Sequence, residues 1–437
     1  MSRFLRIPAG VVSLAVLSAL VLLVVGRGPA TAADDWPQFR GPQRDGKCTE
    51  TGLLAQWAEG QPKLLWKLAG LGRGYSTVAI ADGRILTMGD RQLQGEKSQV
   101  VMAFDLATRK ELWATWVGPP HSDGSRCTPT VDGALTYAVG TDGDLVCVET
   151  ATGKLVWNKN FKKDFGGFMM SVWKFSESPL VDGNKLICTP GGPEATLVAL
   201  DKKTGETIWK CAVPKLGGKG KDGAGYSSMV VAEIEGVRQV VQIFGRGVVG
   251  VAVDSGKFLW GYNDIANGVA NITTPVVHGN HVFVSTAYGT GSALLKIVRE
   301  GDGFKAEKVY FLDAKTFTNH HGGVILVGDC IYGGHGQNNG DPTCIDFLTG
   351  KIVWQQKAIG KGSAAVLYAD GNLIFRYQQT GLVALVEATP KGLHVKGRFE
   401  PAANDGPAWA YPVIHDGRLY LRSHDTLMCY DLRAAAQ

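Results

Sequence analysis

The sequence lacks the short motifs that mark the common catalytic and metal-binding classes. It contains no Gly-x-Ser-x-Gly nucleophile elbow, no His-Glu-x-x-His zinc motif and no Cys-x-x-Cys pair of the kind that holds zinc or haem. None of the 8 cysteines is adjacent to another. These absences exclude the enzyme and metalloprotein classes that depend on such motifs.

Helical periodicity and an excess of one charge are also missing. Beyond the N-terminus no stretch sustains an apolar repeat of about 3.6 residues, so we expect little helix. Removal of the arginines before residue 33 lowers the formal net charge from +5 to +2. The chain therefore offers no field for a polyanion, and we expect no nucleic-acid partner.

Residues 1–32 have the layout of a secretory signal peptide. Arg3 and Arg6 precede an apolar run from Ala9 to Val25, and residues 30–32 supply the cleavage motif. An uncleaved anchor is the alternative, because about 17 apolar residues could just span a bilayer. No cysteine lies near this junction for a lipid anchor. We predict an exported protein, periplasmic or extracellular, that touches the membrane only through the signal segment before cleavage.

One phrase recurs along the rest of the chain. Thr152–Trp157 reads Thr-Gly-Lys-Leu-Val-Trp, an acidic residue precedes it, and its tryptophan recurs at intervals of roughly 44 to 52 residues with one double-length gap. A strand ending at the acidic residue, a turn at the glycine and a second strand with the tryptophan explain the pattern. Since one repeat cannot bury its own face, the repeats must stack. Variants of the phrase occur at residues 108–113, 204–209, 255–260 and 349–354.

The two ends of the repeat region are complementary. An eighth repeat stops at Gln437 without its last strand, while the strand at residues 63–68 carries a tryptophan without a repeat of its own. Joining them hides both sheet edges. We predict an all-β, eight-bladed β-propeller of four-stranded antiparallel blades closed by the N-terminal strand, with seven blades as the alternative. The aromatic residues expected to dock neighbouring blades are Trp66, Trp113, Trp157, Trp209, Trp260, Tyr310, Trp354 and Phe399.

The recurring phrase, with Pro-x-Val-x-Asp-Gly near the start of units, resembles the quinoprotein (PQQ-dehydrogenase-like) eight-bladed propeller superfamily. Within it, residues 61–432 are most similar to exported PQQ-like repeat proteins and BamB-like outer-membrane assembly factors. Residues 36–42 resemble the start of many secreted bacterial members. The expected organisation is a signal peptide (1–32), an N-terminal extension (33–60) and a propeller (61–437). The repeat is specific for the fold and carries little information on chemistry.

The cysteines leave the disulfide pattern open. Cys147, Cys344 and Cys429 take a position where other repeats have alanine, so we expect small buried side chains there. Disulfides remain possible among the others, Cys48, Cys127, Cys188, Cys211 and Cys330, but their pairing cannot be deduced from the sequence.

The loops of one face contain the chemically varied side chains. In this strand order the loop before each blade's first strand and the loop between its second and third strands share a face. Tyr75, Trp173, Tyr226 and Tyr288 belong to these loops. The ligand-binding candidates chosen there are Arg73, Arg126, Arg246, His320, His321, His335 and Trp409.

Two readings of these candidates stay open. The three arginines could gather around an acidic small molecule such as a quinone carboxylate, or they are ordinary surface arginines. The three histidines could meet a metal or an anion, or they line the funnel as polar groups. Because adjacent histidines point to opposite faces of a strand, we expect funnel lining and no metal site.

Two functions follow from the resemblance. The first is a non-enzymatic binding or scaffold module, monomeric and without a cofactor, for a protein, peptide or glycan partner in the cell envelope. The alternative is an alcohol or sugar oxidoreductase with PQQ and Ca²⁺. Many dehydrogenases of the superfamily carry a disulfide between adjacent cysteines over the cofactor, which this chain cannot form. We therefore favour the binding module and predict no catalytic residue.

Overall fold

The computed structural model describes Met1 and residues 35–434. Residues 2–34 and 435–437 lie outside the described residues, and with them the predicted signal peptide. In the part that is described, no helix is long and apolar enough to cross a membrane.

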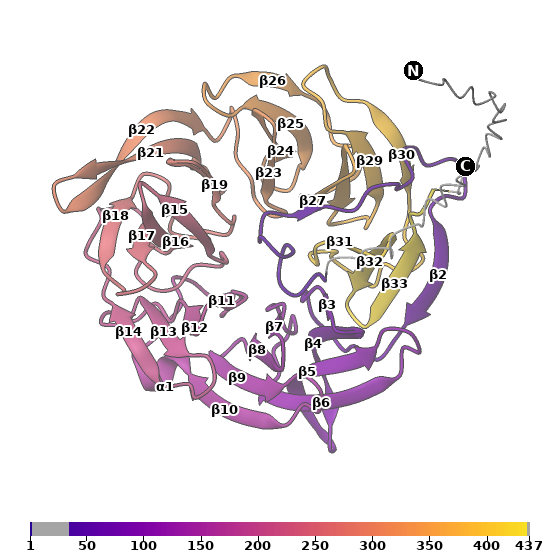
Figure 1. Cartoon of the computed structure of the whole chain (residues 1–437), viewed down its shortest axis with the longest axis horizontal. Helices are drawn as coiled ribbons and strands as arrows, with labels where there is room; N and C mark the ends of the chain where they lie inside the picture. Colours follow the sequence, from indigo (N-terminus) through magenta and orange to yellow (C-terminus); the bar gives the residue numbers. More distant parts are fainter. Residues whose placement is uncertain (2–34, 435–437) are drawn as a thin grey trace. The chain divides into compact units, whose positions relative to one another are not determined.

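Eight blades form a ring (Figure 1). In blades 1 to 7 the chain runs from an inner strand to an outer strand, and the four strands of each blade pair antiparallel. Blades 1 to 4 consist of β3 (Ala79–Ala81), β4 (Arg84–Leu93), β5 (Glu96–Asp105) and β6 (Glu111–Gly118); β7 (Thr130–Asp132), β8 (Leu135–Val139), β9 (Asp144–Glu149) and β10 (Leu155–Asn160); β11 (Leu180–Asp182), β12 (Lys185–Cys188), β13 (Leu197–Asp201) and β14 (Thr207–Cys211); and β15 (Val230–Ile234), β16 (Val237–Phe244), β17 (Gly247–Ala252) and β18 (Phe258–Tyr262).

The second half of the ring repeats this plan. The α-helix among the described residues is the short α1 (Phe161–Phe165), as the missing helical periodicity predicts. Blades 5 to 8 consist of β19 (Val276–His278), β20 (His281–Thr286), β21 (Gly291–Glu300) and β22 (Gly303–Asp313); β23 (Val324–Val327), β24 (Cys330–His335), β25 (Asp341–Asp346) and β26 (Ile352–Gln355); β27 (Ala364–Ala369), β28 (Asn372–Tyr377), β29 (Val383–Glu387) and β30 (Val395–Phe399); and β31 (Val413–His415), β32 (Arg418–Ser423), β33 (Thr426–Asp431) and β2 (Lys63–Leu68).

The N-terminal strand closes the ring. β2 pairs antiparallel with β33, from Lys63 opposite Asp431 to Leu68 opposite Leu427, and forms the outer strand of blade 8. The predicted eight blades and the predicted closure are therefore confirmed. Blade 7 differs in one respect, because β1 (Lys47–Cys48) adds a short parallel strand to the inner strand β27.

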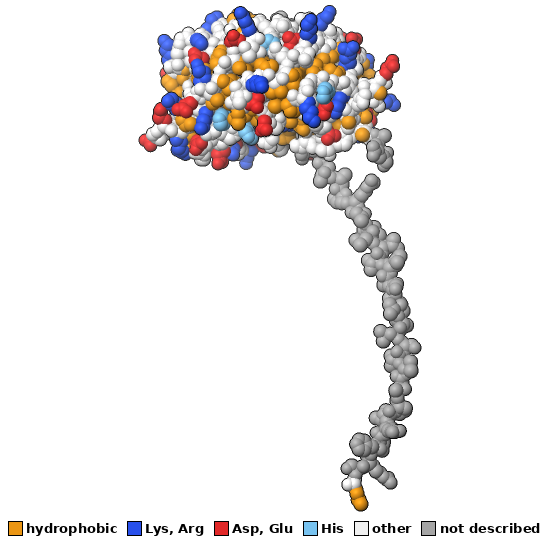
Figure 2. All heavy atoms as spheres, turned by 90° about the horizontal axis from the view of Figure 1, so that it is seen from above, with side chains coloured by type: hydrophobic (Ala, Val, Ile, Leu, Met, Phe, Trp, Pro, Cys, Tyr) orange, Lys and Arg blue, Asp and Glu red, His pale blue; other side chains and the backbone are white. Residues whose placement is uncertain are grey.

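Each outer strand carries a β-bulge at the same place. The register shifts by one residue between Leu155 and Trp157, and every other blade has the equivalent shift. A bulge re-aims the side chain that follows it. In blade 2 the bulged residue Val156 is 44% exposed, and the next residue is the docking aromatic Trp157. Figure 2 shows hydrophobic side chains along the edge of the ring, interspersed with basic and acidic side chains.

The docking aromatic reaches the next blade. The indole Nε1 of Trp113 donates to the Thr150 carbonyl of blade 2 over 3.1 Å, and the Tyr310 hydroxyl donates to the Phe347 carbonyl of blade 6 over 2.9 Å. Trp157, Trp209 and Trp354 make the same kind of bond to Lys202, Val253 and Thr389. Each bond satisfies the polar end of an otherwise buried ring.

The glycine of the recurring phrase has a second purpose besides its turn. Gly153 has φ +71°, and a Cβ there would lie 2.5 Å from the Trp113 ring. Gly205, Gly256 and Gly350 stand in the same relation to Trp157, Trp209 and Tyr310. Glycine and the aromatic of the preceding blade therefore form one contact, which explains why the phrase recurs as a unit.

Two blades modify this contact where the phrase is altered. Blade 5 lacks the Thr-Gly turn that would receive Trp260 of blade 4. Trp260 donates instead to the side chain of Gln239, also in blade 4, over 2.7 Å. In blade 1, Arg109 replaces the glycine, adopts φ 62° and lies 5.8 Å from the centre of the Trp66 ring.

Phe399 packs against the next blade, with ring centres 4.8 Å from Tyr430 of blade 8, but unlike the other docking aromatics it does not stand directly after the bulge. The residue after the bulge is Gly397, which pairs with Leu385, and Phe399 lies two residues further along. A Cβ on Gly397 would meet Trp57 of the N-terminal extension at 2.5 Å. Trp57 is buried and packs edge-on against Phe399 with ring centres 5.4 Å apart. The missing aromatic of blade 7 is thus supplied by another part of the chain.

The extension also fills the centre of the ring, which residues 36–48, here called the channel segment, occupy (Figure 1). The segment bonds to inner strands around the ring, since Trp36 pairs with Ile80 and the Pro37 carbonyl accepts from Val131. Arg40 donates to the Val324 carbonyl over 2.8 Å, and Arg44 donates to the Ser178 carbonyl over 2.7 Å. Both arginines are buried, so they hold the segment from opposite sides.

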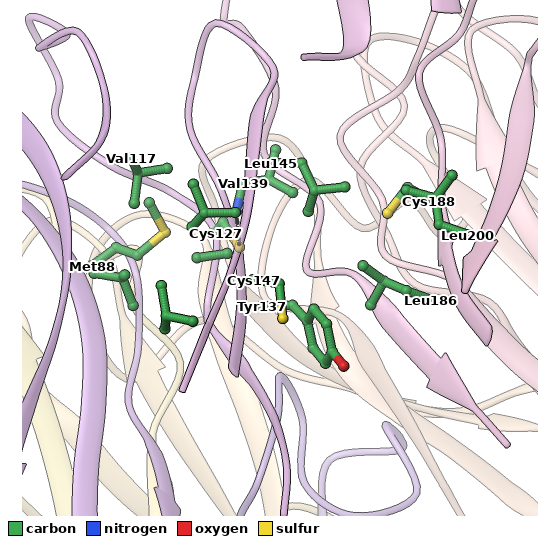
Figure 3. Close-up of a cluster of buried hydrophobic side chains, with 14 of the residues drawn as sticks. Met88, Val117, Cys127, Tyr137, Val139, Leu145, Cys147, Leu186, Cys188 and Leu200 are labelled. Atoms are coloured by element: carbon green, nitrogen blue, oxygen red, sulfur yellow. Dashed lines mark hydrogen bonds between the residues drawn. The ribbon is translucent and has the colours of Figure 1, made fainter. Parts of the chain in front are cut away.

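The cysteines are buried in the blade cores. Cys127, Cys147, Cys188, Cys211, Cys330, Cys344 and Cys429 are free thiols. Cys147 lies among apolar side chains of blades 1 to 3, in the cluster that Figure 3 shows with Cys127 and Cys188. Burial raises the pKa of the Cys147 thiol to about 12, so it stays protonated and packs as a small hydrophobic side chain.

Candidate functional site

A cavity of about 270 Å³ lies above the channel segment, on the face formed by the loops before the inner strands. Seven blades and the channel segment supply its walls. The lining residues are Phe39, Tyr75, Thr77, Asp123, Arg126, Thr128, Trp173, Ser176, Ser178, Tyr226, Ser228, Ala270, Ile272, Tyr288, His320, His321, Trp409 and Tyr411.

Hydroxyl groups in the lower wall join neighbouring blades. The Thr77 amide donates to the Thr128 hydroxyl over 3.3 Å, the Thr128 amide to Ser178 over 3.0 Å, and the Ser178 amide to Ser228 over 3.0 Å. These side chains thereby satisfy backbone donors that the propeller places at the start of successive blades. Each hydroxyl oxygen thus accepts one backbone N–H, while its O–H group and second lone pair remain available.

Aromatic rings form much of the upper wall. Trp173 meets Tyr226 edge-on at 5.8 Å between ring centres and lies nearly parallel to Tyr288 at 6.4 Å. On the other side, Trp409 stacks on His321 at 4.1 Å. Phe39, from the channel segment, packs edge-on against Tyr411 at 5.0 Å.

One of these rings is held in a costly backbone conformation. Tyr288 has φ 55°, in the left-handed region that favours glycine, and glycine follows it directly. Such strain costs about 1–2 kcal/mol and persists only where the surrounding structure enforces it.

The charged groups of the wall balance each other. Arg126 Nη2 bonds to Asp123 Oδ2 over 2.7 Å, and these are the charged residues among the described residues that line the cavity. Burial lowers the pKa of His320 to about 4 and the pKa of His321 well below its ordinary range. Burial also raises the pKa of Tyr75, Tyr226 and Tyr288. Near neutral pH the cavity therefore carries no net charge.

The seven candidates from the sequence fall into two groups. Arg126, His320, His321 and Trp409 come together in the cavity wall. Arg73, Arg246 and His335 are not among its lining residues.

The second group has other partners. Arg246 forms an ion pair of 2.7 Å with Asp222, and His335 Nδ1 accepts from the Thr318 amide over 3.2 Å. Arg73 bonds through its backbone to Asp90 in the blade 1 hairpin over 3.0 Å. Of the three arginines, Arg126 lines the cavity, and the guanidinium of Arg246 is engaged by Asp222 outside it.

Several residues that line the cavity were not among the ligand-binding candidates predicted from the sequence. Tyr75, Trp173, Tyr226 and Tyr288 lie in loops of the predicted face, but the candidates were chosen mainly for charge and metal-binding capacity. Their shared aromatic character was the sequence feature that could have identified them as part of the site. Phe39 had no such signal, because its place depends on how the channel segment runs through the ring.

The wall does not fit PQQ with Ca²⁺. PQQ carries several carboxylates, and a buried anion needs charged or hydrogen-bonding partners, whereas the arginine of the wall is already paired with Asp123. Ca²⁺ takes about six to eight oxygen ligands, mostly from carboxylates and carbonyls. Within residues 35–434, no cluster of three or more His, Cys, Asp and Glu side chains is arranged to hold a metal ion.

Comparison with known proteins gives the family. Residues 97–356, more than half of the chain, match the family model described as outer membrane protein assembly factor BamB. The chain belongs to this family. The resemblance predicted from the recurring phrase is therefore confirmed.

Individual members of the BamB family are distant in sequence. BamB of Kangiella koreensis is 26% identical over 226 residues, which cover 50% of this chain and 49% of that protein. The match thus spans about half the length of this curated relative.

Solved structures agree in fold. BamB of Moraxella catarrhalis superposes with a TM-score of 0.59 at 13% identity, over 86% of this chain and 99% of that one. The quinohemoprotein alcohol dehydrogenase of Comamonas testosteroni gives a TM-score of 0.62 at 14% identity, over 94% and 82%. At these identities the likeness concerns the propeller fold alone.

Proposed function

We propose that this protein is an exported scaffold that binds a protein partner during outer membrane assembly. The observation that carries the proposal is the match of residues 97–356 to the BamB family. The relative named after that role supports a protein partner over a glycan, and the balanced surface charge gives no reason to expect nucleic acid. The proposed place of action is the periplasm, with the chain acting as a monomer.

The architecture suits a binding role. Interlocked blades give a rigid frame, while differing loops meet on one face around the cavity. Near the cavity mouth, Val172 is 75% exposed and its neighbour Trp173 is 37% exposed. Exposed apolar side chains beside a concave site are typical of protein interaction surfaces.

The test is site-specific cross-linking in living cells. A photo-reactive amino acid replaces Val172 on the cavity face, and a matched variant carries it at the exposed Lys154 on the opposite face. We expect Val172 to cross-link to a component of the outer membrane assembly machinery and Lys154 not to do so. Cells without the protein should also contain less folded outer membrane protein. Loss of the gene with unchanged outer membrane protein content, and no cross-link at Val172, would contradict the proposal.

No cofactor belongs to this proposal. Arg126 and Asp123 neutralise each other's charge, so neither is free to neutralise a charged cofactor. A binding scaffold also requires no redox group. The monomeric state is measured by light scattering on the purified exported chain, and a mass of two or more subunits would argue against it.

A further inference from the structure

We propose that the cavity binds an uncharged aromatic side chain of a polypeptide, so that the propeller holds its partner by an aromatic anchor. The inference rests on the proposed function and deepens it by assigning the ligand class of the cavity. Nothing in the family match itself designates this cavity as a binding site.

Charge is the first argument. Arg126 disfavours a cation, Asp123 disfavours an anion, and the two are paired with each other at 2.7 Å. Buried His320 and half-buried His321 are neutral near pH 7, because desolvation lowers the pKa of both. A charged ligand would lose its hydration without gaining a free counter-charge, which costs several kcal/mol, so the cavity favours a neutral group.

The ring geometry is the second argument. Trp173, Tyr226 and Tyr288 line the cavity, with Trp173 edge-on to Tyr226 and inclined by only 28° to Tyr288. Aromatic groups prefer edge-to-face and offset-stacked arrangements, and this wall offers both. Tyr288 keeps this place although its φ of 55° would suit glycine better.

Size separates a side chain from a larger molecule. Pockets for drug-sized ligands have volumes of about 300–1,000 Å³. At about 270 Å³ the cavity lies just below this range, which suits one large side chain. The rest of the partner would lie on the exposed apolar residues of the neighbouring loops, Phe168, Val172 and Val269.

A saccharide is the competing ligand, because sugars also stack on aromatic rings. A buried sugar needs hydrogen bonds for its many hydroxyls. Here the hydroxyls of Thr128, Ser178 and Ser228 already accept backbone N–H groups of neighbouring blades. These bonds fix the orientation of the three hydroxyls, and the aromatic rings that line the cavity favour an aromatic side chain over a sugar ring.

The experiment titrates the purified full-length exported chain with capped pentapeptides Ala-Ala-X-Ala-Ala and follows binding by calorimetry or ligand-observed NMR. X is Tyr, Phe, Leu, Lys or Glu, and maltose serves as the saccharide. We expect the Tyr and Phe peptides to bind at least about 10-fold more tightly than the Lys and Glu peptides. Preferential binding of maltose, or of a charged peptide, would overturn the inference.

A matched pair of variants locates the binding. Trp173→Ala removes a ring that lines the cavity and is 37% exposed, while Trp116→Ala removes a ring of the outer strand β6 that is 47% exposed. A melting temperature close to that of wild type in both variants shows that neither is unfolded. Trp173→Ala should weaken the Tyr peptide by about 10-fold, and Trp116→Ala should leave it unchanged. An equal affinity in both variants would contradict the inference.

The two proposals fail in different ways. If Trp173→Ala loses the Tyr peptide but wild type makes no cross-link to the assembly machinery, the cavity inference stands and the proposed function falls. If the Val172 cross-link forms equally with and without Trp173, the function stands and the aromatic anchor falls.

Discussion

At Gly153 the lack of a side chain permits both a turn and an interface. The residue has φ +71°, and Trp113 of the preceding blade occupies the place of its missing Cβ at 2.5 Å. Gly133, in a turn of the same blade, has φ +55° but nothing within 4 Å of its missing Cβ. A side chain at Gly133 would meet backbone strain alone, whereas one at Gly153 would meet the same strain and also displace an aromatic ring.

We predict that Gly153→Ala lowers the free energy of unfolding by about 2–5 kcal/mol, because strain and a clash add. Gly133→Ala should cost only about 1–2 kcal/mol, from strain alone. Chemical denaturation of both variants measures the difference. Equal losses in the two variants would show that Gly153 is a turn residue and nothing more.

Glu177 links the stability of the ring to pH. It is 3% exposed, its carboxylate accepts from the Thr189 amide, and burial raises its pKa to about 7. Burial disfavours the charged form, so folding favours the protonated acid. Its contribution to stability is complete below the ordinary pKa of about 4.5 and is lost as the pH rises through about 7.

We therefore predict that wild type loses roughly 3 kcal/mol relative to Glu177→Gln between pH 4.5 and pH 7.5. Glutamine keeps an acceptor for Thr189 but cannot ionise. Comparing the two proteins by denaturant unfolding at each pH cancels the titration of all groups that they share. A difference that does not change with pH would refute the assignment of Glu177.

The repeat pattern predicted which face of the propeller carries the cavity better than it predicted which side chains line it. Arg126 and Trp409 line the cavity because loops before the inner strands converge there. Arg246 belongs to the same face, yet its guanidinium turns to Asp222 nearby. The direction of a long loop side chain depends on such partners, which a repeat pattern does not contain.

At the scale of elements, the N-terminal extension both fills the channel and completes blade 7. The sequence predicted an N-terminal extension at residues 33–60, but the partners of this extension lie far along the chain. Arg40 meets Val324, and the Trp57 amide donates to the Lys396 carbonyl over 2.8 Å. Non-repetitive contacts over such separations leave no periodic signal, whereas the strands of the blades do.

Trp57→Ala tests this role of the extension. The ring is 5% exposed and lies against Gly397, so its removal leaves a cavity and should cost about 3–5 kcal/mol of unfolding free energy. Trp116→Ala, at 47% exposure, is the matched control and should cost less than about 1 kcal/mol. Thermal and denaturant unfolding compare the two variants. A loss in Trp57→Ala no larger than in the control would mean that blade 7 does not depend on the extension.

On the scale of the whole molecule, the number of blades and the closure were predictable because both follow from counting. An incomplete last repeat and an unmatched first strand must join to remove two sheet edges, and β2 pairs with β33 as that requires. The cavity was not predictable in the same way. Its walls come from seven blades and from Phe39, so its shape and its charge balance exist only in the assembled ring.

The charge balance of the cavity argues against the binding of a quinone cofactor. The quinohemoprotein alcohol dehydrogenase of Comamonas testosteroni superposes over 94% of the chain, but a common ring does not transfer a reaction. A quinone with several carboxylates would enter a wall whose Arg126 is already bound to Asp123. The desolvation of those carboxylates would then have no compensation.

We predict that purified protein supplied with PQQ and Ca²⁺ shows no dye-linked oxidation of alcohols or aldose sugars. Absorption spectroscopy after gel filtration should find no quinone retained by the protein. Asp123→Asn provides an internal comparison, because it frees Arg126 from its ion pair and should raise any weak affinity for the quinone. Robust turnover by the wild-type protein that requires both PQQ and Ca²⁺ would refute the argument from charge. It would also show that the protein is an enzyme and contradict the proposed scaffold function.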